Sequence, residues 1–342
     1  MKIYLKRKLL FLFVMFVFLI TVNSIFAQNT IQVRLASIVP ENSAWGQAIN
    51  RLAADFRRIT NGQVEVIVFH NGTAGNETEI LRRMRANTLQ AGVFSSMGMN
   101  SITPEVLAFS YPFLIRNEAE YNEVMRQLRP DLISRMERSG FVTLAWVHAG
   151  WIRIFSRTPV ISPNDLRGMR LGSDSNQQEI FQAFRTMRYQ VVPADVTELL
   201  TAFNFNRIDA AYSSPVFVAS NQLFTSARYM SNINVSPFMG GILINRTTWQ
   251  RIPERFRSQL LEVCRRLERE IESSVVSLEN DAIIEMQRYG LTITDLTPAQ
   301  LQVWYDDVAL YENTLIGGNN PVFHREYYTR IKDILTEFRR RN

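Results

Sequence analysis

The 342-residue sequence contains a single cysteine, Cys264. One cysteine cannot form a disulfide within the chain, so the fold cannot depend on such a cross-link. Cys264 lies in an amphipathic helical pattern, which is typical of a small buried side chain. Histidine is also scarce, since only His70, His148 and His324 are present and their spacing is not that of a metal site.

Signature motifs of common enzyme classes are absent as well. The chain has no G-x-S-x-G, H-E-x-x-H, G-x-G-x-x-G, phosphate-binding loop or C-x-x-C. We therefore predict that the protein is not an enzyme and needs no metal or other cofactor. The alternative is a catalytic site assembled from residues far apart in sequence, which turnover of a ligand by the purified protein would reveal.

Lysine is nearly missing from the body of the chain, where it occurs only at Lys332. The formal charge is +6, but residues 2–8 contain four cationic side chains, so the remainder carries only +2. The arginines alternate with acidic residues, as in R-R-L-E-R-E at 265–270. A nucleic-acid-binding protein more often collects cations on one stripe, so this pattern indicates a solvated surface and no nucleic-acid partner.

Long apolar runs are limited to the N-terminus. Residues 1–8 are cationic, residues 9–22 are apolar, and N-S-I-F-A at 23–27 resembles a cleavage site. This arrangement predicts a signal peptide over residues 1–27 and an exported mature protein. An uncleaved membrane anchor is the alternative, because Ile25 is large for its place before the cleavage point. We expect no membrane span in the mature chain.

Strand and helix patterns alternate along the chain. Before residue 150, strand patterns at 31–36, 64–69 and 90–94 are separated by helical patterns at 45–60 and 77–86. This order predicts a parallel sheet with right-handed crossovers. The same order returns after residue 150, with strand patterns at 169–171, 189–192 and 208–212. We therefore expect an α/β protein with two lobes.

Two segments are predicted to connect the lobes. The strand patterns at 141–147 and 151–155 follow one another with only His148-Ala149-Gly150 between them, which indicates a hinge. Residues 253–289 predict an amphipathic helix about 50 Å long, which would lie across both lobes or pack against a partner. The expected first lobe comprises residues 30–149 and 239–278, and the second comprises residues 150–238 and 279–342.

Several motifs in order carry a family resemblance. They are F-H-N-G-T-A-G-N-E at 69–77, F-S-Y-P-F at 109–113, S-P-N-D-L-R-G-M-R-L at 162–171, and the stretches 192–199 and 206–210. With this order and spacing, nearly the whole mature chain resembles the solute-binding proteins of TRAP transporters, the DctP-like family of bacterial periplasmic receptors.

The resemblance implies a fold, a location and partners. The fold would be the two-lobe periplasmic-binding-protein fold, with a hinge, a ligand cleft between the lobes and a long helix spanning both. The protein would be periplasmic, would bind a small-molecule ligand, and would work with the membrane subunits of a TRAP permease. Some members of the family also work with a periplasmic tetratricopeptide-repeat protein.

The chain departs from the family at the position that holds the substrate. In the family, an arginine after the strand G-L-K-I forms a paired salt bridge with the substrate carboxylate. Here G-M-R-L at 168–171 is followed by Gly172. Arg170 would lie deeper in the same strand, so the role is not transferred to it. Arg153 lies close to a second arginine of the family and is the better candidate for binding an anion.

The resemblance also indicates further ligand positions, most of them apolar. They are Ile38, Phe94 with Ser95, Val196, and Met239 with Gly240. Aromatic side chains add candidates, of which Trp151 and Tyr212 are preferred because each lies at or next to a lobe crossing or strand end, together with the serine that follows Tyr212. These are Trp45, Phe113, Trp151, Tyr212, Ser213 and Phe217.

These positions predict the character of the ligand. Loss of a buried arginine costs a carboxylate ligand about 2–5 kcal/mol, whereas an apolar ligand does not need it. We therefore expect a hydrophobic or uncharged ligand. One alternative is an organic acid bound through Arg153. Another, from a different class of protein, is a periplasmic adaptor that uses the long amphipathic helix as its interaction surface.

Overall fold

The structure is a computed structural model that describes residues 30–174, 178–317 and 321–341. The predicted signal peptide, residues 1–27, lies outside these ranges. Among the helices of the described residues, none combines the length and the apolar character required to cross a bilayer.

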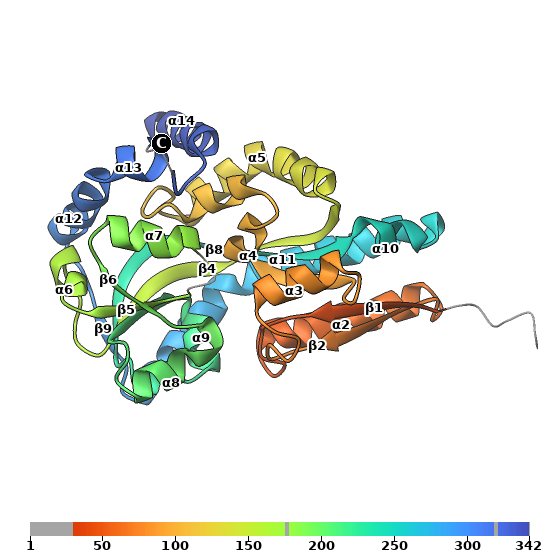
Figure 1. Cartoon of the computed structure of the whole chain (residues 1–342), viewed down its shortest axis with the longest axis horizontal. Coiled ribbons are helices and arrows are strands. Elements are labelled where there is room, and N and C mark those ends of the chain that lie inside the picture. Colours follow the sequence, from red (N-terminus) through yellow and green to blue (C-terminus); the bar gives the residue numbers. More distant parts are fainter. Residues whose placement is uncertain (1–29, 175–177, 318–320, 342) are drawn as a thin grey trace, which may run out of the picture.

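Within the described ranges the strands form one sheet of nine, in the order β2-β1-β3-β8-β4-β7-β5-β6, with β9 paired to β8. At one end β1 (Ile31–Ala36) pairs in parallel with β2 (Val64–Phe69) and β3 (Ala91–Ser95). At the other end β5 (Arg170–Ser173) pairs in parallel with β6 (Gln190–Pro193) and β7 (Ala210–Ser213). The two parallel groups are the cores of two lobes, which confirms the predicted α/β class (Figure 1).

Two long antiparallel strands connect the groups. They are β4 (Phe141–Ser156) and β8 (Tyr229–Asn245). The sequence predicted two strands on either side of residues 148–150, but β4 is continuous and its register with β8 shifts between His148 and Trp151. Gly150 has φ +100° there, and the Trp151 N–H donates to Glu279 Oε1 at 2.8 Å. The predicted hinge is therefore an irregularity within one strand.

Helices of the first lobe surround its strands. They are α2 (Ala44–Ile59), α3 (Glu77–Arg85), α4 (Ser96–Asn100), the 3-10 helix η2 (Pro104–Ser110) and α5 (Glu118–Arg138). Polar side chains begin them, because the first N–H groups of a helix need acceptors. Ser43 accepts from Gly46 N at α2, Asn76 accepts from Glu79 N at α3, and Ser95 accepts from Gly98 N at α4.

The second lobe carries shorter helices. They are α6 (Pro163–Arg167), α7 (Gln178–Thr186), η3 (Val196–Glu198), α8 (Leu199–Asn204), α9 (Pro215–Ser220) and η4 (Leu223–Thr225). The start of α6 is a capping box between Ser162 and Asp165, and Gly168 ends it. The helix start and stop expected from S-P-N-D-L-R-G are therefore present.

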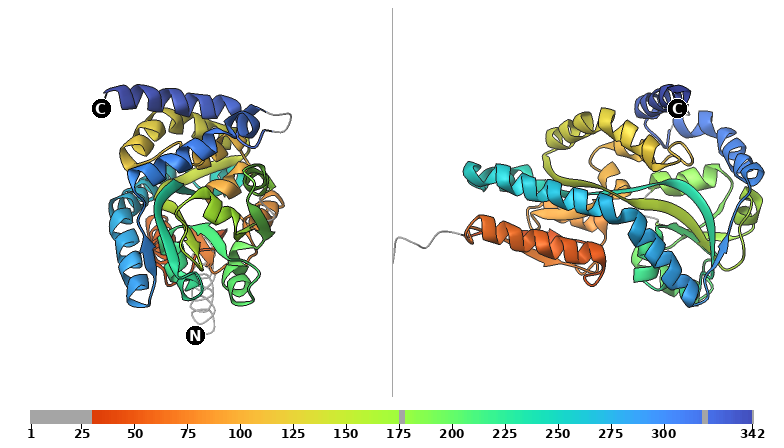
Figure 2. Two further views of the ribbon diagram at one scale, coloured as in Figure 1. Left: turned by 90° about the vertical axis from the view of Figure 1, so that its left-hand side faces the viewer. Right: turned by 180° about the vertical axis from the view of Figure 1, so that it is seen from behind.

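A long helix, α11 (Glu254–Arg288), follows α10 (Arg246–Arg251). It packs against α2 of the first lobe, against β4, and against α9 of the second lobe. Figure 2 shows it running behind both lobes, as the sequence predicted. Cys264 lies on its buried face, which is the position expected for it.

The C-terminal elements contact both lobes. They are β9 (Thr292–Thr294), α12 (Pro298–Ala309), α13 (Glu312–Gly317) and α14 (Arg325–Arg341). On α12, Asp307 Oδ2 pairs with Arg167 Nη2 of the second lobe at 2.7 Å. In contrast, α14 packs on the first lobe, where it contacts α5 and η2. The sequence predicted residues 279–342 in the second lobe alone. The contacts of these residues with both lobes do not define a boundary, so the lobe boundaries stay a prediction.

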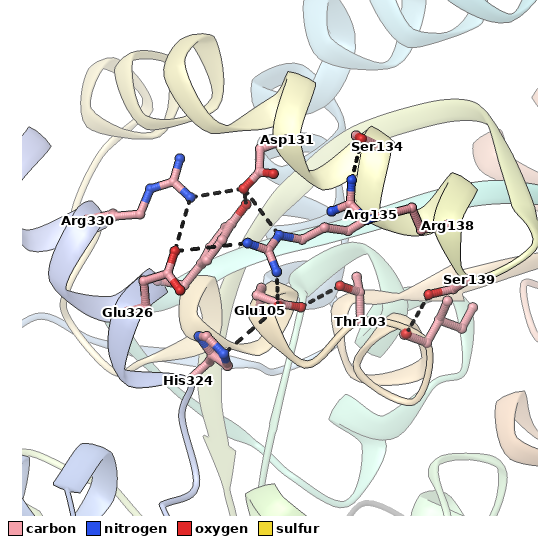
Figure 3. Close-up of polar contacts among 12 residues, drawn as sticks. Thr103, Glu105, Asp131, Ser134, Arg135, Arg138, Ser139, His324, Glu326 and Arg330 are labelled. Carbon is pink, nitrogen blue, oxygen red and sulfur yellow. Dashed lines mark hydrogen bonds and ion pairs between the residues drawn. The ribbon is translucent and has the colours of Figure 1, made fainter.

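A set of polar side chains, here called the Glu105–Asp131 network, holds α14 against α5 and η2 (Figure 3). Its members are Glu105, Asp131, Arg135, Glu326, Tyr327 and Arg330. Asp131 Oδ2 accepts from the Tyr327 hydroxyl at 2.5 Å and from Arg330 Nη1 at 2.9 Å. Arg135 pairs with both Asp131 and Glu105. Each carboxylate at the centre of the network therefore has a cationic partner.

Candidate functional site

A cleft lies between the lobes at the point where the carboxyl ends of their strands face each other. Ile38 follows β1, while Ser95, Ser173 and Ser213 end β3, β5 and β7. Open α/β sheets bind ligands beyond these strand ends. Thus the topology itself selects this region as the candidate site.

The cleft consists of two adjoining hollows. The first, here called the polar hollow because Asp174 and Glu179 line it, although most of its lining surface is apolar, has a volume of about 980 Å³, including the part open to solvent. Its lining also includes Glu77, Ser95 and Ser173. The apolar hollow has about 850 Å³ on the same measure and is lined mainly by aliphatic and aromatic side chains. The two share the residues Ile38, Glu77, Ser95, Phe217 and Phe238. A single ligand can therefore extend from one into the other.

Ten of the fourteen predicted site residues line these hollows. The polar hollow contains Gly172, Val196, Tyr212 and Ser213, the apolar hollow contains Trp45, Phe94 and Gly240, and both contain Ile38, Ser95 and Phe217. Trp45 packs against Phe238, with ring centroids 5.9 Å apart. Contact of these residues with a ligand stays a prediction.

Three predicted residues, Phe113, Trp151 and Met239, line neither hollow. Phe113 packs against the ring of Tyr305 on α12, with centroids 5.5 Å apart. Trp151 is buried with its ring 5.4 Å from that of His148. Met239 is buried and lies opposite His148 in the strand register. The side chains of all three residues are part of the core.

The fourth residue outside the hollows is Arg153. Ile152 lines the polar hollow but Arg153 is in the lining of neither hollow, and the register of β4 with β8 shifts between Ile152 and Ile154. The Arg153 guanidinium hydrogen-bonds Asn232. Burial lowers its pKa, and only the charge of Glu279 on α11 opposes this shift. Arg153 is therefore a partner of groups outside the cleft lining.

Gly172 lies in the lining of the polar hollow, at the end of β5. A Cβ at this position would lie 2.8 Å from Ile208 Cδ1 and 3.5 Å from Leu199 Cδ2. Apolar side chains thus occupy the direction in which the expected arginine would begin. Arg170, two residues earlier, is bound to Asp209 through two hydrogen bonds of 2.7 Å.

The charges of the cleft are all of one sign. Among the described residues that line either hollow, the charged side chains are Glu77, Asp174 and Glu179, and there is no arginine, lysine or histidine. Asp174 directly follows β5, and Glu179 lies on α7. Sequence reasoning missed all three. The rule that ligands lie beyond the carboxyl ends of strands could have found Asp174, two residues after Gly172.

Glu77 is the most unusual of these acids because its carboxylate is buried. It accepts from the Ser95 N–H at 2.6 Å and from Ser95 Oγ at 2.8 Å. Burial raises its pKa from 4.5 to about 7, and the nearby charge of Asp174 also raises it, although the hydrogen bonds from Ser95 oppose the shift. Near neutral pH this carboxyl group can therefore gain or lose a proton within the cleft.

The lobes contact one another beside the cleft. Asn76 Nδ2 on the first lobe donates to Asp195 Oδ2 on the second at 3.2 Å. The Tyr212 hydroxyl lies 3.8 Å from Met97 Sδ across the polar hollow. The structure therefore shows the lobes in contact around a space that they enclose together.

Comparison with known proteins places these features in a family. A family model described as "Bacterial extracellular solute-binding protein, family 7" (DctP) matches residues 35–313. The 2,3-diketo-L-gulonate-binding periplasmic protein YiaO of Escherichia coli is 24% identical over 242 residues, which are 69% of this chain and 73% of YiaO. The C4-dicarboxylate-binding periplasmic protein DctP of Shewanella loihica is 22% identical over 281 residues, 80% of this chain and 82% of the relative.

Solved structures agree in fold. The sugar acid binding protein of Advenella mimigardefordensis in complex with galactonate superposes with a TM-score of 0.82 at 16% identity, covering 90% of this chain and 98% of the other. A TRAP periplasmic solute binding protein of Shewanella oneidensis with bound succinate gives 0.81 at 18% identity, covering 89% and 99%. At these identities the likeness demonstrates the fold alone.

Proposed function

Because the chain belongs to the family 7 bacterial extracellular solute-binding proteins, as its motifs predicted, we propose that it is the periplasmic receptor of a TRAP-type transporter. This is a family of solute-binding proteins and not of enzymes. In this proposal the cleft captures a small ligand, the lobes close around it by bending of β4 and β8, and the receptor delivers the ligand to the membrane subunits of the permease. An accessory tetratricopeptide-repeat partner stays a prediction.

The ligand that we propose is hydrophobic or uncharged over most of its surface. The observation that carries this proposal is a cleft lining with no cation among the described residues. Organic anions such as succinate and galactonate, which are bound by the structural relatives, need a buried donor of positive charge. An arginine supplies it best, because its planar fork matches a carboxylate. In this proposal Gly172 corresponds to that arginine, and the side chains of Ile208 and Leu199 lie where its side chain would begin.

The apolar hollow offers an alternative source of binding energy. Burial of about 400 Å² of apolar ligand surface contributes roughly 10 kcal/mol before costs. Ordering and association costs remove several kcal/mol, which leaves affinity of about micromolar strength. An apolar ligand therefore needs no ion pair in order to be retained.

Native mass spectrometry of protein purified without added ligand tests this proposal. We expect a co-purified apolar molecule, and isothermal titration calorimetry should detect no binding of succinate or galactonate at millimolar concentration. The Shewanella-type receptor with bound succinate provides a positive control for the calorimetry. A co-purified dicarboxylate, or micromolar binding of succinate, would refute the proposed ligand class.

A further inference from the structure

We propose that Glu279 of α11 is a latch on the hinge of β4: its bond to the Trp151 N–H stabilises the arrangement in which the lobes touch, and the bond breaks when the lobes separate. This inference rests on the proposed function, in which the lobes move by bending of β4 and β8. It adds the residue that sets the balance between the two arrangements.

Two glutamates of α11 accept hydrogen bonds from the backbone of β4. Glu268 Oε1 accepts from the Trp146 N–H at 2.6 Å, and Glu279 Oε1 accepts from the Trp151 N–H at 2.8 Å. The glutamates are eleven residues apart, which is about three turns and about 16–17 Å of helix. The five residues from Trp146 to Trp151 span about the same length of extended strand. The helix therefore holds β4 at two points whose spacing matches.

The two points lie on opposite sides of the irregularity in β4. Trp146 pairs with Gly241, in the part of β8 that also pairs with β3 of the first lobe. Trp151 pairs with Pro237 beyond the register shift, and from Arg153 onward β4 pairs with β7 of the second lobe. Bending of β4 between the two points therefore changes the distance from α11 to at least one of the two N–H groups.

The two contacts differ in the support that they have. Glu268 also pairs with Arg129 of α5, whose Nη2 lies 2.6 Å from Oε1, so its charge is balanced within the first lobe. Glu279 is buried and forms no ion pair within the described part of the chain. Burial raises its pKa, and the Trp151 N–H and the more distant charge of Arg153 only oppose this shift. A buried carboxylate without a contacting cation is the less stable of the two, so Glu279 is the contact that breaks.

Gly150 permits the close approach of Glu279 to the hinge. Its φ of +100° lies in a region that residues with a side chain rarely adopt. A Cβ at this position would lie 2.6 Å from Glu279 Cδ. The carboxyl group thus occupies the space that a side chain would need, and the latch lies against the residue with the greatest backbone freedom in the hinge.

The hinge and the latch border the apolar hollow. Ala149 of the hinge lines this hollow, and so does Phe238, which lies between the β8 partners of His148 and Trp151. Two side chains of α11, Leu267 and Ile271, line it as well. In the proposed function, a ligand that fills the hollow packs against β4, β8 and α11 together. It therefore favours the arrangement in which the latch is formed.

Distances between the lobes test the latch. Nitroxide labels on Arg57→Cys of α2 and Thr201→Cys of α8, both exposed positions, report lobe separation in double electron–electron resonance, and the buried Cys264 stays unlabelled. Without ligand, we expect Glu279→Leu to lower the ratio of touching to separated lobes by at least about tenfold, because a hydrogen bond to a charged group is lost. Glu279→Gln keeps an acceptor, so its change should be only about threefold. Distances that Glu279→Leu leaves unchanged would overturn the inference.

Two variants on the same helix are the controls. Glu272→Leu removes an exposed glutamate one turn after Glu268, to which no β4 N–H donates within the described ranges, so the lobe distances should stay unchanged. Glu268→Gln loses the ion pair with Arg129, and it should lower thermal stability without changing the distances. A change of distances in Glu268→Gln as large as that in Glu279→Gln would refute the assignment of the latch to Glu279.

Amide exchange gives a readout at the two bonds themselves. The chain has five tryptophans, and selective isotope labelling of tryptophan reports the backbone amides of Trp146 and Trp151 in nuclear magnetic resonance spectra. Glu279→Leu should speed hydrogen exchange of the Trp151 amide at least about tenfold and leave the Trp146 amide unchanged. If Glu279→Leu does not fold, Glu279→Gln should still speed exchange at Trp151 by about threefold and not at Trp146. Exchange at Trp151 that neither variant changes would contradict the latch.

The outcomes separate this inference from the function on which it rests. If the native protein shows two lobe separations and Glu279→Leu leaves their ratio unchanged, hinge closure stands and the latch fails. If the native protein and every variant show one and the same separation, the lobes do not move, and the proposed capture of a ligand by closure fails as well.

Discussion

Carboxylates in the Glu105–Asp131 network and in the cleft have opposite surroundings. Asp131 accepts hydrogen bonds from Tyr327, Arg330 and Arg135, the bond from Tyr327 having the largest effect, and its pKa falls to about 2. Burial alone would raise the pKa of Glu105, but the hydroxyl of Thr103 and the charge of Arg135 outweigh it and lower the pKa. Glu77 has only uncharged donors, those of Ser95 and the N–H of Gly98, and burial raises its pKa to about 7.

The comparison shows which acids serve the fold. In the network the cations come from the chain itself, so the charges are matched in the folded protein and help to fix α14 on α5. In the cleft the chain supplies no cation among the described lining residues. An ionised Glu77 therefore costs stability, because its charge is buried without a cationic partner.

The largest expected effect comes from removing the cation at the centre of the network. Arg135→Met leaves Glu105 buried without its ion pair, and we expect the free energy of unfolding to fall by about 3 kcal/mol at pH 7. Urea denaturation measures the change. Arg138→Met, on the same helix, is the control, because Arg138 is exposed and bonded to Ser134. An equal, small effect of both substitutions would mean that the network does not stabilise the fold.

Substitution of Glu77 should change the free energy of unfolding by almost as much as Arg135→Met, but in the opposite direction. Its folded-state pKa lies above the unfolded value, so its contribution to stability is complete below pH 4.5 and is lost as the pH rises through 7. Glu77→Gln should therefore increase the free energy of unfolding by up to about 3 kcal/mol at pH 8 and change it little at pH 4.5. Urea denaturation at both pH values, with Glu79→Gln as the control, checks this. A pH-independent difference would contradict the raised pKa.

A cation introduced into the cleft should make the cleft resemble the network, in which carboxylates have cationic partners. We expect Gly172→Arg combined with Ile208→Ala to gain succinate affinity by about tenfold, or about 1.4 kcal/mol. Ile208→Ala is included because Ile208 Cδ1 would lie 2.8 Å from the new Cβ. Isothermal titration calorimetry should show no gain in the single variant Ile208→Ala. If the double variant also gains nothing, Gly172 does not correspond to the family's arginine.

The smallest effect is expected at the edge of the network. The Arg330 side chain is 37% exposed, so solvent screens its pair with Asp131. Arg330→Gln should lower the free energy of unfolding by about 0.5–1 kcal/mol. The loss should shrink in 1 M salt, because exposed ion pairs are screened. A loss as large as that of Arg135→Met would show that burial does not decide the strength of these pairs.

Local sequence signals predicted much of the fold. The capping residues Ser162 and Asp165, the stop at Gly168 and the apolar period of α11 depend on interactions within a few residues, so they can be recognised without the tertiary structure. They predicted elements close to those in the structure. The signals could not show that β4 is continuous through residues 148–150, because Glu279, far along the chain, provides the acceptor for its irregular N–H.

The candidate site was predictable only in part. Ile38, Ser95 and Gly172, which the family resemblance indicated, lie near strand ends and line the hollows. Arg153 and Ile152 are adjacent in sequence, and only the register of β4 determines that Ile152 faces the hollow. A shift of one residue in a strand reverses the face of a side chain, and sequence patterns do not locate strands that finely.

The sequence by itself determined the two-lobe α/β class and the family, because these depend on residue order and local propensity. Only the tertiary structure decided which charges have partners. Asp131 has one local partner, Arg135 four residues later on α5. Arg330 and Tyr327 reach it only because α14 packs on α5, whereas Glu77 has no cation because it is buried where two lobes enclose a space.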